Sequence, residues 1–459
     1  MREHRELRSL QGTFGIIVSS FFCATALAQT AGPPPLGPVP PPSTAGSQPI
    51  DLPTTLRLAG ANNIDLALVK EALVQAQAQN DAATLGLLPS LAGGVGYSKH
   101  NGAIQDVSGN VIDVNKQLHT ATGGLTSQVN LGDAIFQKLS ASRLQTAAEF
   151  SVDAGHNVTL YTAAAGYLDL VNATANQKIA DDAVRISKDY GAQIDRAVAI
   201  GLANKSDLLH VNVQTQNYEL TLRQAQEAVV SASARLANIL HVEPATRFAP
   251  KDDIAPQITL ISLESKLDGL ESEALSKRPE VKASAASLEA ADWQKTQSIY
   301  GPLIPSVGAQ AVYGNISGGH LGAPSNSGGT QDYAVMFNWR VGAGGLLDFS
   351  RIDYARSKLE QARLNDAKLR DNVGRQVVQT YEAVHSAFDQ LQLAKRNVEL
   401  AEQSLQLSQG RKEFGVAAVL EVIQAQRDLV QARAAQAAAL TAYAEGQYAL
   451  AEAIGRISE

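Results

Sequence analysis

Several residue types are scarce in this chain of 459 residues, which has one cysteine, two methionines and only 5% aromatic residues. The cysteine, Cys23, lies in an apolar N-terminal run, so a chain cleaved after that run could form no disulfide. Only Met1 and Met336 are methionines, which excludes a methionine-rich relay for soft metal ions. The histidines are scattered, and the sequence contains no nucleophile–base constellation. We therefore expect no enzyme, no cofactor and no metal site.

Long hydrophobic runs are scarce as well. One such run follows three arginines and ends in Ala-Leu-Ala, which predicts a secretory signal peptide over residues 1–28. Phenylalanines precede Cys23 where a lipoprotein signal requires a small residue, which argues against lipidation. No other stretch has the roughly 18 consecutive apolar residues of a membrane helix, so a mature chain that enters a membrane must use strands. Removal of three arginines and two glutamates with the leader changes the net charge from −7 to −8, which argues against a nucleic-acid partner.

Proline divides the remaining chain. Residues 29–53 are rich in proline and predict an extended linker. The two stretches that follow, 54–250 and 251–459, contain long segments without proline that are rich in Ala, Leu, Gln, Glu and Arg, a composition typical of long helices. We expect a helical hairpin in each stretch, with turns near residues 201–207 and 415–421. Each stretch reads helix, strand, loop, strand, long helix, turn, long helix.

Matching segments recur at a nearly constant spacing in these two stretches. A helix-to-strand turn recurs after 216 residues, and a glycine followed six positions later by an acid recurs after 214. The matching residues are Leu88-Pro89-Ser90-Leu91 with Ile304-Pro305-Ser306-Val307, and Gly201 and Asp207 with Gly415 and Glu421. Parallel spacings with a slip of two residues indicate an internal duplication, so 54–250 is a first repeat and 251–459 a second.

Four short segments alternate apolar with small or polar residues, at about 89–99, 123–133, 305–314 and 332–342. In the last, the apolar positions are Tyr333, Val335, Phe337, Trp339 and Val341. About ten residues suit a tilted strand that crosses a bilayer. Four strands cannot close a barrel, and lipid does not tolerate an unpaired edge, so we expect several subunits to share one barrel. The residues expected to face lipid are Tyr333, Val335, Phe337 and Trp339; the aromatic ones could instead pack between subunits.

The second repeat contains two parallel rows of apolar residues with a spacing of seven. The first row is Leu391, Val398 and Leu405, and the second row is Leu393, Leu400 and Leu407. A two-stranded coiled coil needs one such row, whereas two rows on one helix indicate helices on both sides. The pattern favours a curved wall of helices over an isolated rod, unless the second row is an accident of a leucine-rich helix.

These features together resemble the TolC-like outer membrane efflux protein family. The resemblance covers nearly everything after Pro53 and depends on the order of motifs that are individually unspecific. Besides the two repeats, these motifs are the Arg278-Pro279-Glu280 helix start, the Gly344-Gly345 elbow between strand and helix, and the Phe414-Gly415-Val416-Ala417 turn. The fold class that it implies is mostly α with a transmembrane β portion: duplicated long helical hairpins forming a periplasmic tunnel, and four strands from each chain in a trimeric, 12-stranded outer-membrane barrel.

The resemblance also implies partners and sites. The homotrimer would sit in outer-membrane lipid and dock on a periplasmic adaptor protein and an inner-membrane pump of RND, ABC or MFS type. Turns at the periplasmic end would contact the adaptor, and charged residues beside them would form a gate. The expected adaptor-docking residues are Gly201, Leu202, Ala203, Gly415, Val416 and Ala417, and the gate candidates are Asp207, Glu421, Lys205, Arg427 and Asp428.

Two alternatives remain open at this point. Asp207 and Glu421 could simply complement the dipole at the start of a helix, and Arg427 could form a surface pair with Glu421 or Asp428 on one helix. For the whole chain, the alternative to an exit duct is a secreted periplasmic coiled-coil scaffold or adaptor without a channel. Such a protein would not need four strands with one apolar face. Drugs, solvents, metal ions and proteins all remain possible cargo.

Overall fold

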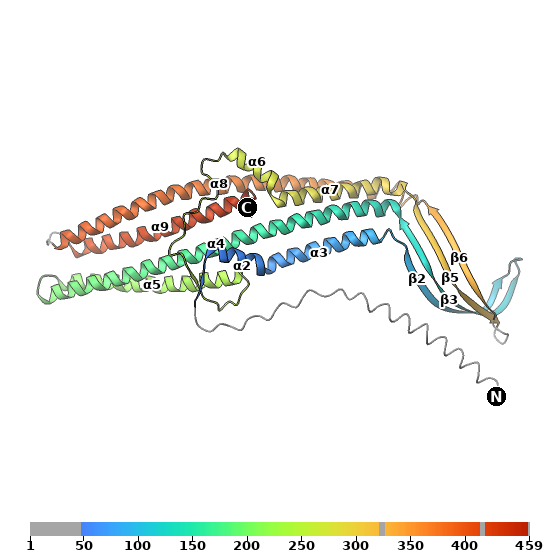
Figure 1. Ribbon diagram of the computed structural model, residues 1–459, viewed down its shortest axis with the longest axis horizontal. Coiled ribbons are helices and arrows are strands. Elements are labelled where there is room, and N and C mark those ends of the chain that lie inside the picture. Colours follow the sequence, from blue (N-terminus) through green and yellow to red (C-terminus); the bar gives the residue numbers. More distant parts are fainter. Residues whose placement is uncertain (1–46, 321–325, 414–417, 458–459) are drawn as a thin grey trace, which may run out of the picture. The chain divides into compact units, whose positions relative to one another are not determined.

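Four long helices make up most of the computed structural model, which describes residues 47–320, 326–413 and 418–457. They are α4 (Leu131–Ala199), α5 (Lys205–Ile239), α8 (Phe349–Glu413) and α9 (Val419–Ala453). Within the unit that begins at Ser47, α4 packs beside α5 and α8 beside α9, and the two hairpins meet where α4 contacts α9 (Figure 1). At 1.5 Å per residue, α4 alone extends about 100 Å. The expectation of a mostly helical fold with long hairpins is confirmed.

Shorter helices flank these hairpins. They are α2 (Leu52–Asn62), α3 (Ile64–Leu85), α6 (Leu267–Lys277), α7 (Pro279–Tyr300) and the 3-10 turn η2 (Gly301–Leu303). The side chain of Asn63 starts α3 by accepting a hydrogen bond from the Leu66 N–H at 2.9 Å. α3 packs on α4, and α7 lies between α4 and α8. In the part of the chain that the structure describes, no helix has both the length and the hydrophobicity needed to cross a membrane.

The predicted helix start Arg278-Pro279-Glu280 also holds the second repeat together. Pro279 is the first residue of α7, where its missing N–H costs no hydrogen bond. The buried Arg278 guanidinium donates to Gln376 Oε1 on α8 at 2.6 Å and lies 3.6 Å from a carboxylate oxygen of Glu452 on α9. A buried charge is stable only when it is paired, and the partners of Arg278 lie on α8 and α9. This side chain therefore links the start of α7 to both of these helices.

Two sheets complete the unit. The larger has the strands β2 (Ser90–Gln105), β3 (Val111–Asn130), β5 (Ser306–His320) and β6 (Asn326–Asn338), in that order and antiparallel throughout. The smaller pairs β1 (Gln48–Ile50) with β4 (Phe248–Pro250) in parallel. β2 and β6 are the free edges of the larger sheet, to which each repeat contributes one hairpin.

The strands of the first hairpin are longer than their alternation predicts. The polar stretch expected to form a loop continues the ladder, and only residues 106–110 separate β2 from β3. Asp106 closes the turn by accepting hydrogen bonds from the Ser108 and Asn110 N–H groups at 2.9 and 2.8 Å. Backbone groups form the ladder, so polar side chains do not prevent pairing once a turn has set the register.

The last strand begins and ends earlier than predicted, which corrects the placement of Trp339 and Val341. β6 ends at Asn338, and the Trp339 indole N–H donates to the Leu303 carbonyl at 3.3 Å. The chain then turns through Gly342 and Gly344, which have φ values of 99° and 72° that favour glycine. Asp348 accepts hydrogen bonds from Gly344 and Arg351 N–H groups, and α8 begins at the next residue. The glycine-rich elbow between strand and helix is thus observed, but it starts earlier than the apolar pattern suggests.

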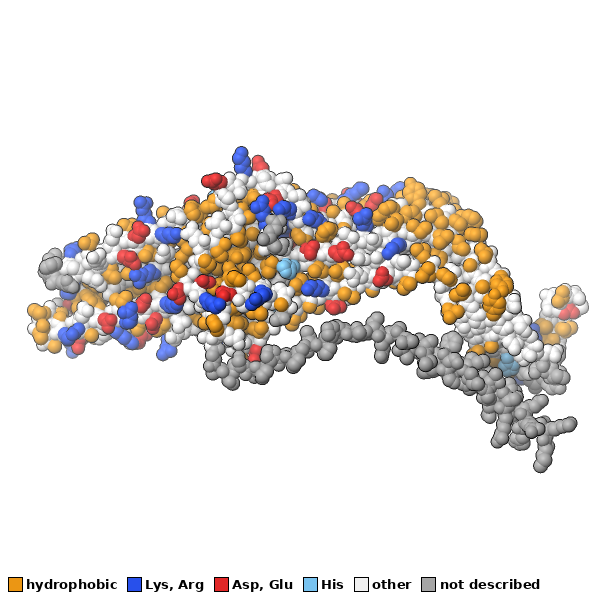
Figure 2. Space-filling model, in the orientation of Figure 1, with side chains coloured by type: hydrophobic (Ala, Val, Ile, Leu, Met, Phe, Trp, Pro, Cys, Tyr) orange, Lys and Arg blue, Asp and Glu red, His pale blue; other side chains and the backbone are white. Residues whose placement is uncertain are grey.

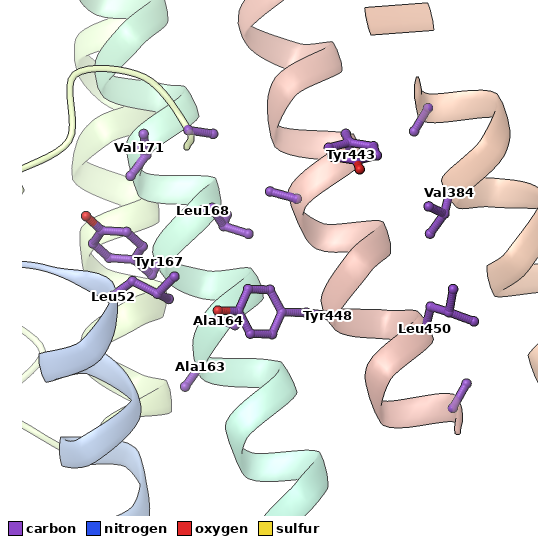
Figure 3. Close-up of a cluster of buried hydrophobic side chains, with 14 of the residues drawn as sticks. Leu52, Ala163, Ala164, Tyr167, Leu168, Val171, Val384, Tyr443, Tyr448 and Leu450 are labelled. Atoms are coloured by element: carbon purple, nitrogen blue, oxygen red, sulfur yellow. The ribbon is translucent and has the colours of Figure 1, made fainter. Parts of the chain in front are cut away.

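The hydrophobic core lies where α4, α8 and α9 meet. Leu168 of α4 lies on the side that faces Tyr448 of α9, whereas Tyr167 lies on the side of Leu52 of α2, and Val384 of α8 lies on the other side of α9 (Figure 3). Gln447, fully buried on α9, accepts hydrogen bonds from the backbone N–H groups of Leu260 and Ile261 at 3.0 and 2.8 Å. The irregular segment between the repeats is therefore fixed to the core.

The two predicted leucine rows on α8 have different surroundings. In the first row, Leu391 has 0% exposure and Val398 packs on α9, as a buried seam should. In the second row, Leu393, Leu400 and Leu407 are 68%, 58% and 68% exposed. One side of the α8–α9 hairpin is therefore packed within the chain, while a second apolar side is open.

Candidate functional site

The turn between α4 and α5 presents apolar side chains at the end of the first hairpin. Gly201 has a φ of 78°, which lets the Leu202 N–H donate to the Ala197 carbonyl at 2.8 Å and end α4. Leu202 is 78% exposed, and Ile200 beside it is exposed too. Ala203 packs inward against a hydrophobic cluster. This turn offers a small apolar knob on a rigid helical support.

Asp207 and Lys205 follow this turn at the start of α5. Lys205 is the first residue of the helix and is exposed. Asp207 is the third residue, and its Oδ2 accepts a hydrogen bond from the Asn204 N–H at 3.4 Å. This is the position at which a carboxylate complements the helix dipole, so the alternative foreseen for Asp207 agrees with the geometry.

The second hairpin has an equivalent acid in a different setting. Gly415, Val416 and Ala417 lie outside the described residues. Glu421 is the third residue of α9, and it accepts a hydrogen bond at 3.0 Å from Arg411 near the end of α8. The two acids predicted to be equivalent thus occupy the same helical position, but only Glu421 has a cross-helix ion pair among the described residues.

Arg427 and Asp428 lie one to two turns further along α9 and are exposed. Asp428 accepts a hydrogen bond from Gln424 at 2.8 Å. Within the described chain, no ion pair joins Arg427 to Glu421 or to Asp428. Glu421 therefore pairs with Arg411 and not with Arg427. Arg411 and Glu421 lie on different helices, so residue spacing along one helix could not predict their pair.

A shared hydrophobic cluster holds the ends of the two hairpins together. It joins Tyr190, Ile194 and Val211 of the first hairpin to Val419, Val422 and Ile423 of the second. Burial, with a smaller effect from the Asp207 carboxylate, raises the pKa of Tyr190 to about 12. The structure thus brings Asp207 and Glu421 to the same end of the helices, on either side of one apolar contact.

The second candidate region is the large sheet, whose register separates two chemical faces. Residues paired across an antiparallel ladder point to the same side. One such row joins Leu91, Leu125, Ala311 and Tyr333, and another joins Val129, Val307 and Phe337. Rows on the other side join Gly94, Thr122, Gly314 and Thr330, and Ser90, Thr126, Gln310 and Ala334. We call these the apolar face and the polar face of the sheet.

Most side chains of the apolar face are exposed in the single chain that the structure describes. Tyr333, Val335 and Phe337 are all exposed, Val335 to 66%, and Trp339 is exposed just beyond the strand. The apolar rows run from Phe337 to Tyr97, a span of about ten residues or roughly 33 Å along a strand. Strands tilted in a membrane barrel would reduce this height to about 25 Å, the height of the apolar band of such barrels. On the face shown in Figure 2, hydrophobic side chains gather over the sheet near its junction with the helices, whereas charged side chains spread over the helices.

Sequence patterns gave no expectation for two partly buried carboxyl groups on α9. Burial and the charge of Asp169 raise the pKa of the Glu445 carboxyl to about 7. Burial also raises the pKa of Glu452, against the opposing effect of Arg278. Glu445 lies in a run of alanines and tyrosines on α9. An acidic residue among such small and aromatic residues is the sequence feature that could have indicated a partly buried carboxyl group. In the described chain, no cluster of three or more His, Cys, Asp or Glu could hold a metal ion.

The comparisons with known proteins agree with this architecture. Residues 270–456 match the sequence model of the family described as outer membrane efflux protein. The resemblance seen in the sequence to TolC-like outer membrane efflux proteins is confirmed.

Two curated proteins are similar to part of the chain. BepC, an outer membrane efflux protein of Brucella suis biovar 1 (strain 1330), is 22% identical over 307 residues, covering 65% of this chain and 64% of BepC. NccC of Alcaligenes xylosoxydans xylosoxydans, a nickel-cobalt-cadmium resistance protein, is 30% identical over 123 residues, covering 26% of this chain and 28% of NccC. The matched part thus spans less than two thirds of either curated relative.

A solved structure extends the likeness to the fold of both repeats. The outer membrane protein VceC of Vibrio cholerae superposes with a TM-score of 0.73 at 19% identity, covering 88% of this chain and 96% of VceC. The likeness therefore includes the first repeat, which lies outside the family match. At this identity the superposition establishes the fold of the chain.

Proposed function

We propose that this protein is the outer-membrane exit duct of a tripartite efflux or type I secretion system. Three copies would close one 12-stranded barrel in the outer membrane, and their helices would form a tunnel through the periplasm. The observation that carries the proposal is the four-stranded sheet, which has an exposed apolar face and two free edges, β2 and β6. Each free edge costs unpaired backbone groups in lipid, and closure with other copies removes that cost.

The helices support the same assembly independently. The open row of Leu393, Leu400 and Leu407 repeats every seven residues on α8, the spacing of a coiled-coil seam. Exposed apolar residues also lie on α5, at Leu209, Val213 and Leu220. In a trimer the α8–α9 hairpin of one copy meets the α4–α5 hairpin of the next, so these two surfaces cover each other. A scaffold protein without a channel would not require the apolar face of the sheet.

The proposed roles of individual residues follow from their places in this assembly. Tyr333, Val335, Phe337 and Trp339 would face lipid. The turns Gly201-Leu202-Ala203 and Gly415-Val416-Ala417 would contact the periplasmic adaptor, which connects the duct to an inner-membrane pump. Asp207 and Glu421 would form rings of charge at the periplasmic aperture, with Lys205, Arg427 and Asp428 beside them. The exposed apolar knob at Leu202 supports the docking role.

The protein purified from detergent-extracted outer membranes tests this function. A barrel should migrate faster on a denaturing gel before boiling than after it, and the trimer should conduct ions in planar bilayers in steps of uniform size. Replacing Leu393, Leu400 and Leu407 together by serine should weaken the trimer without unfolding the subunit, and the matched serine variant of exposed Gln390, Gln403 and Gln406 should not. Release of the protein in soluble form, without heat-modifiable migration, would exclude the barrel.

A further inference from the structure

Two basic side chains lie opposite each other near the end of the large sheet that is remote from the helices. The register pairs His100 of β2 directly with Lys116 of β3, and Lys116 is in turn the register partner of His320 on β5. His100 and Lys116 are both exposed. Among the described residues, neither forms an ion pair with an acid.

His100 and Lys116 line one hollow, of about 580 Å³. Its other side chains are mostly apolar or small, including Ile104, Val114 and Leu118. His100 and Lys116 are separated by even numbers of residues from Gly94 and Thr122, so they belong to the polar face of the sheet. That face turns toward the lumen if the apolar face meets lipid.

No carboxylate lines this hollow. Asp113 is the register partner of Ala103, in a row that belongs to the apolar face, and Asp106 is engaged in closing the hairpin turn. On the polar face, Asp332 is in the row of Gly124, eight residues or roughly 27 Å along β3 from Lys116. The charge of Lys116 is therefore not neutralised by any carboxylate that the structure describes.

We propose that His100 and Lys116 form an anion-binding collar at the exit of the channel, selective for small anions with two or more charges. This rests on the proposed function, because the trimer arranges three copies of the pair around one lumen. Rings of lysine or arginine attract anions, and low-dielectric walls focus their field.

Citrate is the probe that tests the collar, with binding measured by titration calorimetry on the full chain purified in detergent. Replacing His100 and Lys116 together by glutamine should weaken citrate binding by about tenfold or more, because the variant loses charge-assisted hydrogen bonds to the anion.

The same strands supply a matched control on the apolar face. Lys99 precedes His100 and points to the opposite side, and His119 on that side packs against the Tyr97 ring with centroids 4.8 Å apart. The K99Q/H119Q variant loses the same residue types, so it should bind citrate as the natural protein does. Equal citrate binding by K99Q/H119Q and H100Q/K116Q, or equal loss in both, overturns the collar.

Planar bilayers separate the collar from the function on which it rests. Citrate added on the exterior side should reduce the current of the natural trimer and of K99Q/H119Q, and much less that of H100Q/K116Q. A natural protein that forms no channels overturns the proposed exit duct, while calorimetry on the same sample still decides whether His100 and Lys116 bind anions. A conducting H100Q/K116Q trimer that citrate blocks fully shows instead that the exit duct is correct and the collar is wrong.

Discussion

The helices and the large sheet are stabilised in opposite ways. The helices bury a continuous core of their own, with Tyr167, Leu168 and Leu391 at or near 0% exposure. In the four strands of the sheet, Val129 is the one buried side chain among the residues described. The helical part therefore carries its stability within one chain, whereas the sheet must obtain much of its stability from surroundings that a single chain does not provide.

This difference shows that a row of apolar residues can pack either inside one chain or against something outside it. Leu391 and Leu393 both belong to heptad rows, yet only Leu391 is buried within its own chain. Apolar burial contributes about 25 cal/mol per Å² whether the cover is the same chain, another copy or lipid-like surroundings. Exposed apolar rows with a regular spacing thus mark where cover has to come from outside.

The largest expected effect comes from breaking the core seam. Leu391→Ala should lower the free energy of unfolding by about 2–5 kcal/mol, because it removes a fully buried side chain and leaves a cavity. Leu393→Ala, two residues further along the same helix, should leave the subunit's unfolding nearly unchanged and reduce the fraction of trimer. Denaturant unfolding and analytical ultracentrifugation measure the two quantities. Equal unfolding losses in both variants would show that the two rows do not differ in this way.

The next effect concerns the apolar face of the sheet. Val335→Arg should cost about 2–4 kcal/mol of insertion free energy, because a charge near the midplane would meet lipid. Ala334→Arg is the matched control, since Ala334 points to the polar face beside Gln310. The amounts of heat-modifiable protein in outer membranes report insertion. Normal insertion of Val335→Arg would show that this face does not meet lipid.

Sequence periodicity predicted the helices well because the patterns extend over many turns. The row of Leu391 could be recognised without knowledge of its partner, and the turn at Gly201 followed from a glycine between two proline-free segments. Strand ends were less predictable. Polar residues after Lys99 continue β2, and Trp339 lies beyond β6, since ladder pairing depends on register and on the turn more than on side-chain hydrophobicity.

Contacts between distant segments could not be predicted from the sequence. Arg411 and Glu421 belong to different helices, and His100 faces Lys116 only because a five-residue turn sets the register of β2 and β3. The Glu445 carboxyl acquires its raised pKa from burial between helices and from Asp169 on α4. Such features depend on which elements meet, and local residue patterns carry no information about that.

A smaller effect is the pH dependence of the helical seam at Glu445. Its pKa is raised from the usual 4.5 to about 7, so folding favours the protonated form, and stability falls as the pH rises between these values. Glu445→Gln should therefore raise the melting temperature at about pH 8 and change it little at about pH 4, as thermal unfolding at both values measures. Asp169 is paired at 3.7 Å with Arg235, so Asp169→Asn should give a smaller gain. Glu227→Gln on α5 is the control: Glu227 is exposed, so this variant should leave the melting temperature unchanged at both pH values.

The smallest effects on stability, and the sharpest test of the aperture, come from the two helix starts. Asp207→Asn and Glu421→Gln should each cost about 0.3–1 kcal/mol, the usual contribution of a charge at a helix terminus. In planar bilayers the double variant should raise single-channel conductance and weaken cation preference, because two rings of negative charge are lost from the proposed gate.

Arg411→Gln distinguishes a gate from two helix caps. Arg411 pairs with Glu421 but with no described acid of the first hairpin, so its loss leaves the Glu421 ring uncompensated. Cation preference should then increase, opposite in sign to the effect of Glu421→Gln. If both residues act only on helix stability, the three variants should share the conductance and selectivity of the natural protein. Opposite shifts in selectivity from the two members of one ion pair can arise only where that pair faces the path of the ions.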